Sequence, residues 1–569
     1  MPDTLGIGVG ALNALQTAIK TTGQNIANVN TDGYSRQSVT FATNPPDQQG
    51  GYYVGAGVTV VSIDRAYDEF LTRDVQQRTA SASLYTNLAE SAGRVDELFA
   101  DDATGIGPAL SEFFSALEAV ANSPTTLPER QVLISNGETL AERFDYFDTR
   151  LSDFQTDLNV KINSAVQDIN QFSEVIAQLN DQIALQTAQT GGNAAGDLLD
   201  KRDEAIRELS ELVGTTVQAQ DDGALNVFIG DGQPLVIGSQ VNTLSTTNDP
   251  LRPNRLNVKS VTEAGQVSDV TNFLSGGSIG ASLQAYEDVI EQARRDIGVL
   301  AAGLTVSFNE VHAGGFDLND NTGVPFFSPE AAEPLIVASS NNTGVTNISA
   351  PGVVMTAVIY DSDPALSGDV SELSGDSLRL DYSGGNLTFI NLRTGQSQEF
   401  TGINGGGDFS EIVDGVRVSI DAATIANLDD GDSFLLEPTR TSAEKFGVFI
   451  TDATQVAIAQ QAGAPGDNRN ALDLIALQSE STLLGESSYF DFYSNITSRV
   501  AVQTRRANSL AETETALLSS AQARQSNLNG VNLEEEAANL IRFQQAYQAA
   551  AQIIATARDA FDTILRATQ

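Results

Sequence analysis

Residues 21–37 of this 569-residue chain read TTGQNIANVNTDGYSRQ, a polar stretch that follows the first helical segment. Asn and Gly tolerate left-handed backbone conformations that other residues resist, and Asn and Thr side chains bond to nearby backbone groups. The stretch therefore predicts a turn that ends the first helix. The residues that characterise this signature turn are Asn25, Asn28, Asn30, Thr31, Gly33 and Tyr34.

The segment before the turn carries a heptad pattern, which is typical of a helix that packs along another helix. One series repeats every seven residues and consists of Leu5, Leu12, Ile19 and Ile26. A second series follows three residues after each of these and consists of Gly8, Leu15, Thr22 and Val29. Gly8 and Thr22 make the seam imperfect.

The C-terminal segment VNLEEEAANLIRFQQAYQAAAQIIATARDAFDTIL predicts a second amphipathic helix. Asn532 is placed to cap it, and Glu534, Glu535 and Glu536 occupy the first turn, where the helix dipole favours acidic groups. One stripe contains Leu533, Ala537, Leu540, Gln544, Tyr547, Ala551, Ile554, Arg558, Phe561 and Leu565. A parallel stripe contains Phe543, Ala546, Ala550, Ile553, Ala557, Ala560 and Ile564. Together they form an apolar face too wide for a simple contact between two helices.

Helical stripes usually bury against the rest of their own domain. These two segments lie at opposite ends of the chain, however, and neither has an adjacent apolar sequence long enough to cover it. We therefore expect the two terminal helices to pair with each other and then with other subunits.

Between the ends, helical patterns dominate residues 67–190, with a break at Ser123–Pro128, and we expect a long helical bundle at the centre. Its clearest stripe runs from Leu158 to Ile183. A short strand is expected at Gly57–Arg65, hairpins follow residue 213, and helix returns over residues 279–311. A second β-rich stretch covers residues 331–440 and includes the hairpin LRLDYSGGNLTFINL, and a further helical region is expected from Ser442.

The predicted fold is mainly α with β-rich insertions, in a multidomain chain. We expect residues 1–50 and 525–569 to form a terminal helical domain. Residues 51–200, 279–330 and 441–524 should form a helical-bundle domain, residues 201–278 a hairpin-rich segment, and residues 331–440 an outer β-rich domain.

Composition excludes several classes of function. The chain has 74 acidic and 31 basic residues and a net charge of −43, which disfavours nucleic acids and anionic membranes as partners. It has no Cys, so disulfides and cysteine-bound metals are excluded. No apolar run approaches the roughly 18 residues of a membrane span. The N-terminus lacks a positive region before its apolar part, so we expect no cleaved secretory signal.

Two motifs suggest enzymatic chemistry but fit other structures better. GIGVGA, residues 6–11, matches a dinucleotide-binding pattern, but too few residues precede it to form the required strand. GGSIG, residues 276–280, matches the nucleophile turn of hydrolases, with His312 downstream and Asp288 and Asp296 between. Because these residues fall within one predicted helix, a helix-start turn is favoured, and we expect no catalytic residues and no cofactor.

Two Asp-rich loops resemble cation sites only superficially. In FDLNDNTG, residues 316–323, Asp317, Asn319 and Asn321 alternate, but the glycine is one position late for a calcium loop and Ser328 replaces its bidentate Glu. DDGDSF, residues 429–434, has the same ambiguity. Hydrogen-bonded turns are the favoured interpretation, and we expect no metal site.

The sequence also resembles a known family. NIANVNTDGYSRQ, residues 25–37, is similar to the N-terminal signature of bacterial flagellar axial proteins, and its GYSRQ ending resembles the flagellar hook-associated protein 1 family, also called the FlgK family. Four further segments agree in order: GVTVVSIDRAYDEFL, DLLDKRDEAIRELSELVG, NEVHAGGFDLNDNTGVPFF and PGDNRNALDLIALQ. The C-terminal segment is similar to that of axial proteins generally, and the resemblance is weakest over residues 331–440.

The resemblance implies a structural subunit of the junction between flagellar hook and filament, exported by the flagellar type III system without a cleaved signal. The implied partners are identical subunits in a ring, the hook protein, the second hook–filament junction protein and a cytoplasmic export chaperone at the C-terminal helix. It also implies that the terminal helices pair in an inner tube and that the signature turn redirects the chain outward. The implied interface residues are Leu5, Leu12, Leu15, Ile19, Ile26, Leu540, Phe543, Tyr547, Ile553, Ile554, Phe561 and Leu565, with Leu540, Tyr547, Ile554 and Phe561 meeting the N-terminal helix.

Two alternatives stay open. One is another axial protein of the hook or distal-rod type, because these share the terminal signature. The other is a secreted serine hydrolase built on Ser278 and His312.

Overall fold

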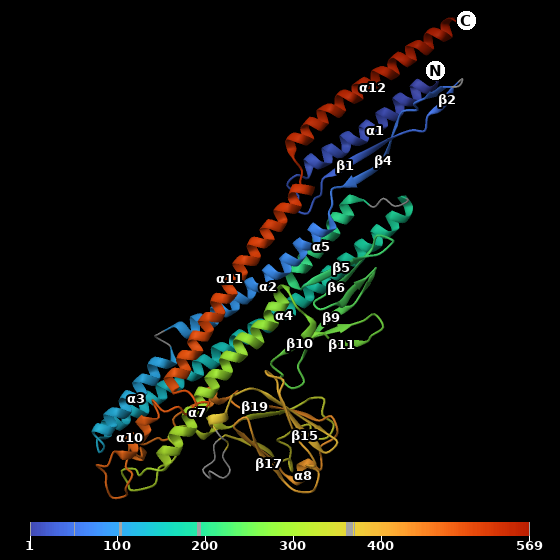
Figure 1. The fold of residues 1–569 in the computed structure, drawn as a ribbon. Helices are drawn as coiled ribbons and strands as arrows, with labels where there is room; N and C mark the ends of the chain where they lie inside the picture. Colours follow the sequence, from blue (N-terminus) through green and yellow to red (C-terminus); the bar gives the residue numbers. More distant parts are fainter. Residues whose placement is uncertain are drawn as a thin grey trace.

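The computed structural model describes residues 2–49, 52–101, 105–190, 195–359, 368 and 370–567, which form an elongated molecule (Figure 1). The terminal helices α1 (Pro2–Ala27) and α12 (Leu533–Ala567) lie side by side at one end, as predicted. The fold is mainly helical, with antiparallel sheets on one side. None of the helices in those ranges is both long and apolar enough to cross a membrane.

Small residues allow the terminal helices to approach each other closely. A methyl group added at Gly8 would lie 2.6 Å from Cγ1 of Ile554, so only glycine leaves room for the isoleucine. Thr22 is buried too. The two positions that interrupt the heptad pattern in the sequence are therefore both in the interior. The other buried residues of α1 are Ala14, Ala18, Thr21 and Asn25.

A two-stranded ribbon lies beside α1. It pairs β1 (Gln37–Thr43) with β4 (Val58–Arg65), and a smaller hairpin joins β2 (Asp47–Gln49) to β3 (Tyr52–Val54). Of these strands, the sequence indicated only β4. The partner strand β1 was missed because it follows directly on the signature turn.

Long helices build the central bundle. They are α2 (Glu69–Ala100), α3 (Ile106–Asn122), α4 (Leu127–Thr190), α5 (Gly196–Leu212), α6 (Gly277–Ala285), α7 (Gln292–Ala313) and α11 (Tyr489–Asn529), and a π-helical turn (Tyr286–Glu291) joins α6 to α7. Four phenylalanines at the centre have ring centroids 4.9–5.8 Å apart. They are Phe113, Phe308, Phe326 and Phe327.

The 64-residue helix α4 belongs to two cores. Its first half packs in the helical bundle, whereas Ile162, Ile169 and Ile176 pack against α5 and the neighbouring sheets. The stripe from Leu158 to Ile183 was predicted as part of a helical bundle. Most of it packs against both the helix α5 and β strands, because a regular apolar stripe does not specify what covers it.

Seven strands make two sheets against α4. The first has β5 (Thr215–Ala219), β6 (Leu225–Ile229), β7 (Gln233–Ile237) and β8 (Gln240–Val241) in chain order. The second pairs β10 (Leu256–Val261) with β9 (Thr243–Asn248) and β11 (Val267–Asp269). A 3-10 turn (Thr271–Phe273) then leads to α6. The hairpins predicted after residue 213 are thus confirmed.

The outer β-rich part contains two further sheets. One has the order β12 (Leu335–Ala338), β19 (Ser433–Glu437), β14 (Leu378–Ser383), β15 (Asn386–Asn391) and β16 (Ser397–Phe400). The other has the order β13 (Met355–Val358), β18 (Val416–Ile420) and β17 (Phe409–Val413), followed by the short helix α8 (Ala422–Ile425). The predicted hairpin is confirmed as β14–β15, and both turn glycines, Gly384 and Gly385, have positive φ. Short 3-10 turns lie at Pro329–Ala332 and Val370–Glu372.

The helical region predicted from Ser442 is wrong over residues 446–488. That segment contains only a 3-10 turn (Ala453–Gln455) and α10 (Arg469–Ala476), after the short α9 (Ser442–Lys445). Buried side chains replace the hydrogen bonds of a helix there. The guanidinium of Arg130 donates to the carbonyl of Val456 at 2.6 Å, and the amide of Asn470 donates to the carbonyl of Ala457 at 2.7 Å.

Candidate assembly site at the terminal helices

Asn25 is the centre of the signature turn and is 1% exposed. Its side-chain amide donates to the carbonyl of Gln37 at 2.9 Å and to the carboxylate of Glu536 at 3.0 Å. Its side-chain oxygen accepts from the hydroxyl of Tyr34 at 2.8 Å and from the backbone N–H of Gln37 at 3.0 Å. Both donors and both acceptor positions of the amide are therefore used, which fixes the turn to the first helical turn of α12.

Arg36 makes the second link to the C-terminal helix. Its guanidinium donates to Glu536 and to Glu535, each at 2.8 Å, and its backbone N–H donates to the carbonyl of Asn529 at the end of α11. The carboxylate of Glu536 is almost fully buried. Asn532 caps α12, as predicted, by accepting the N–H of Glu534 at 3.0 Å.

The DKRDE motif, residues 200–204, forms the link from the turn to the helical bundle. Asp200 accepts from the backbone N–H of Ser35 at 3.0 Å. Arg65, at the end of β4, donates to Asp200 at 2.8 Å and to Asp203 at 2.7 Å. Arg202 points to the other side of α5, where it donates to Asn180 on α4.

Electrostatics keeps the tyrosine of the turn protonated. Burial raises the pKa of Tyr34 to about 12, and the carboxylates of Asp197, Asp200 and Glu536 act in the same direction. The phenol thus remains a hydrogen-bond donor to Asn25 over the physiological pH range. Burial likewise raises the pKa of Asp203, against the effect of Arg65.

The remaining turn residues shape the loop itself. Asn28 donates to the carbonyl of Gln24 at 3.0 Å and accepts from the hydroxyl of Thr31 at 3.2 Å. Gly33 has a φ of +74° and faces the side chain of Glu204, so a larger residue would be strained there. Asn30 is exposed.

The residues expected at an assembly interface divide into two groups. Leu5, Tyr547, Ile553 and Phe561 are exposed, with Phe561 at 53%. The half-buried group is Leu12, Leu15, Ile19, Ile26, Leu540, Phe543 and Ile554. The side chain of Leu565 lies outside the described residues. Their role in assembly stays a prediction.

The less exposed face of α12 combines residues of both stripes, and Ile554 lies against Gly8 of α1. Ala550 is buried, and Phe543 and Ala557 are half-buried, whereas Tyr547 and Phe561 remain largely exposed.

The motifs with possible catalytic chemistry have structural roles. His312 is fully buried, its Nδ1 bonds to the carbonyl of Val324 at 2.6 Å, and its Nε2 accepts the N–H of Ala457 at 2.8 Å. Both ring nitrogens are thus engaged by backbone, and neither is free to activate Ser278, which lies in the first turn of α6. Residues 6–11 lie inside α1.

The Asp-rich loops use their carboxylates to bond to backbone. Asp317 accepts from the N–H groups of Asn319 and Asn321 at 2.7 and 2.8 Å. Asp432 is 1% exposed and accepts from the N–H groups of residues 343–345. Within the described ranges, no three acidic or histidine side chains are grouped to hold a metal ion.

Models of known families match three parts of this chain. A model described as flagella basal body rod protein matches residues 5–34, and one described as flagellar basal body rod FlgEFG protein C-terminal matches residues 526–567. The model for the flagellar hook-associated protein FlgK helical domain matches residues 92–327. The flagellar hook-associated protein 1 of Salmonella typhimurium is 31% identical over 99% of this chain and 100% of its own length. This chain belongs to the flagellar hook-associated protein 1 family.

Other members agree with this assignment. The hook-associated protein 1 of Escherichia coli K12 is 30% identical over 99% of this chain and 100% of its own length. The solved structure of the flagellar hook junction protein FlgK from Burkholderia pseudomallei covers 80% of this chain and 100% of its own, with a TM-score of 0.69 and 20% identity, so the fold is shared. This member of the hook-associated protein 1 family is a structural component of the flagellum.

Reasoning from the sequence alone identified the turn but missed its partners. Glu536, Arg36, Asp200 and Arg65 all lie in segments that the family resemblance singled out. Nothing in their spacing indicates that they meet, because the contacts join residues 135 to 511 positions apart.

Proposed function

We propose that this protein forms the junction between the flagellar hook and the filament, and that it assembles at the distal end of the hook through its terminal helices. The observation that carries the proposal is the pairing of α1 with α12, which is locked at Asn25 and Glu536 while large apolar side chains on both helices stay exposed. A helix pair with uncovered apolar residues gains stability when further copies cover them. The proposed partners are identical subunits in a ring, the hook protein and the second junction protein.

The proposal extends to export and domain organisation. The chain leaves the cell through the flagellar type III system without a cleaved signal, and a small cytoplasmic chaperone covers the C-terminal helix before export. The division into a terminal domain, a helical domain, a hairpin-rich segment and an outer β domain belongs to the same proposal. Separate hydrophobic cores in the helical part and in the outer β part support it.

Electron microscopy of a deletion strain tests the central claim. Cells that lack the protein should carry hooks without filaments and should release flagellin into the medium, and expression of the wild-type chain should restore filaments. Deletion cells with normal filaments would contradict the proposal.

A further inference from the structure

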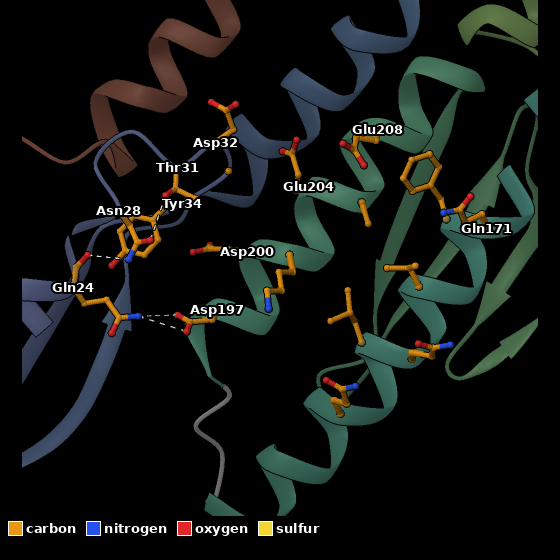
Figure 2. A pocket seen from close by; sticks show the side chains of 18 residues that line it. Gln24, Asn28, Thr31, Asp32, Tyr34, Gln171, Asp197, Asp200, Glu204 and Glu208 are labelled. Atoms are coloured by element: carbon orange, nitrogen blue, oxygen red, sulfur yellow. Dashed lines mark hydrogen bonds between the residues drawn. The ribbon is translucent and has the colours of Figure 1, made fainter. Parts of the chain in front are cut away.

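A groove of about 530 Å³ lies beside the signature turn (Figure 2). The turn forms one wall, α5 runs along it, and α4 contributes the apolar side chains of Phe172, Val175 and Leu179. Val175 is 39% exposed although it lies close to a hydrophobic core. The groove therefore offers apolar surface next to the joint between the terminal helices and the helical bundle.

The groove is lined by five carboxylates and one cation, Lys201, so its lining is acidic on balance. Asp32, Glu204 and Glu208 lie along one side (Figure 2), and Asp197 lies below them. Glu204 pairs with Arg207, but no cation of the described chain lies within ion-pair distance of Asp32, Asp197 or Glu208. The chemistry that fits this groove is an apolar helix face that carries positive charge.

The C-terminal helices of this chain have that chemistry. Exposed arginines without a carboxylate partner occur, within the described residues, only on α11 and α12, and they are Arg505, Arg506, Arg542, Arg558 and Arg566. Residues 537–567 contain three Arg against two Asp, in a chain whose net charge is −43. Arg558 follows Tyr547 by eleven residues, and Phe561 follows Arg558 by three. Both intervals are close to whole turns of an α-helix, so the three side chains lie on one face of α12.

We propose that the groove receives α12 of a second copy of this chain. Phe561 of that copy contacts the apolar surface at Val175, and Arg558, one turn earlier on the same face of α12, contacts the carboxylate of Glu208. The helix of the same chain cannot occupy the groove, because Glu536 holds its first turn at Asn25 and Arg36 and the helix then runs along α1 away from α5 (Figure 1).

Such a contact joins two different surfaces of identical chains, and repetition of this type of contact builds a ring or a helical array. The inference rests on the proposed function, since it specifies how neighbouring subunits meet.

Disulfide cross-linking in assembled flagella tests the contact cleanly because the chain contains no Cys. In the double variant Val175→Cys with Phe561→Cys, oxidation should produce dimers and longer ladders of this chain. The matched control is Val160→Cys with Phe561→Cys, because Val160 is 65% exposed on the same helix but lies outside the groove. The control should remain monomeric.

Attached filaments with no cross-link from Val175, or with equal cross-linking from Val160, would overturn the inference while leaving the proposed function intact. An adduct with a different, smaller protein in place of a second copy would also overturn it. Failure of the proposed function itself would appear separately, as normal filaments on deletion cells.

A charge exchange provides an independent measurement. Glu208→Arg alone should reduce the fraction of cells with filaments, and adding Arg558→Glu should restore it. Absence of restoration in a double variant that is secreted at the wild-type level would count against the proposed pairing.

Discussion

Asn25 and Glu536 are 511 positions apart in the sequence, yet the amide of Asn25 donates to the carboxylate of Glu536 at 3.0 Å in the interior of the protein. This bond closes the two ends of the chain onto the signature turn. Because Arg36 neutralises the same carboxylate, the buried charge has both a cationic and a neutral partner.

Replacement of Asn25 should loosen this joint. Asn25→Ala leaves the buried phenol of Tyr34 and part of the carboxylate of Glu536 without partners, which costs roughly 2–4 kcal/mol. Hydrogen exchange should show faster opening of the first turns of α12. The exposed Asn30→Ala is the control, and we expect it to change exchange little. Equal protection in both variants would show that Arg36 alone holds the helix.

The two glycines Gly6 and Gly8 should respond in opposite directions. Gly8→Ala forces a methyl group to 2.6 Å from Ile554 and should weaken the helix pair, whereas nothing lies within 4 Å of a methyl group at Gly6. Gly6→Ala should stabilise α1 by about 0.5–1 kcal/mol through helix propensity. Denaturant unfolding, followed by a probe attached to α1, measures the stability of both variants.

A compensating substitution makes this prediction sharper. Ile554→Ala should remove the clash in the Gly8→Ala background. The double variant should therefore lose less unfolding free energy than the sum of the losses in the two single variants. Additive losses would contradict the close contact between these two positions.

His312 should make stability depend on pH. Burial lowers the pKa of His312 to about 4, from 6.5 in the unfolded chain. The unfolded state therefore binds the proton first, so the contribution is complete above pH 6.5 and is lost as the pH falls from 6.5 to 4. The loss amounts to about 3 kcal/mol. Because the chain has a single His, one imidazole NMR signal reports this pKa directly.

Two carboxylates act in the opposite direction in the same pH range. Burial raises the pKa of Asp296 and of Asp414 to about 6, so each stabilises the fold as the pH falls towards 3.8. The comparison with His312→Gln isolates the histidine, and the difference in unfolding free energy between the two proteins should change between pH 6.5 and 4. A constant difference would show that the imidazole has the same pKa in the folded and the unfolded protein.

The exposed stripe of α12 should be needed for chaperone binding. Tyr547→Asp with Phe561→Asp adds charge to two side chains that are 37% and 53% exposed, so the monomer should fold normally. We expect loss of affinity for the export chaperone and loss of filament attachment, since unpaired carboxylates are costly in an apolar contact. Calorimetry with the purified chaperone measures the first effect.

The matched control adds the same charges elsewhere on this helix. Gln545→Asp with Gln552→Asp changes two exposed residues of α12 outside that stripe and should preserve binding. If both double variants lost chaperone affinity equally, the chaperone would be responding to the added net charge and not to the loss of the aromatic side chains.

The sequence by itself determined the local features of this protein. The turn after α1, the Asn532 cap, the hairpin around Gly384 and Gly385 and the amphipathic terminal helices follow from residues that are near one another in the chain. Capping, turn geometry and helical periodicity act over a few residues, and such signals can be read directly.

Only the tertiary structure decided which surfaces meet. An apolar stripe shows that a helix face is buried but does not show what covers it. The stripe of α4 packs on α5 and on two sheets, and the face of α12 that is least exposed combines Ile554 with alanines such as Ala550. The buried bonds of Asn25, Arg130 and His312 join segments far apart in sequence, and no local pattern encodes them. Residues 446–488 therefore remain irregular outside α10 and one 3-10 turn, and side chains such as Arg130 of α4 and His312 of α7 bond to backbone groups there that a helix would have paired.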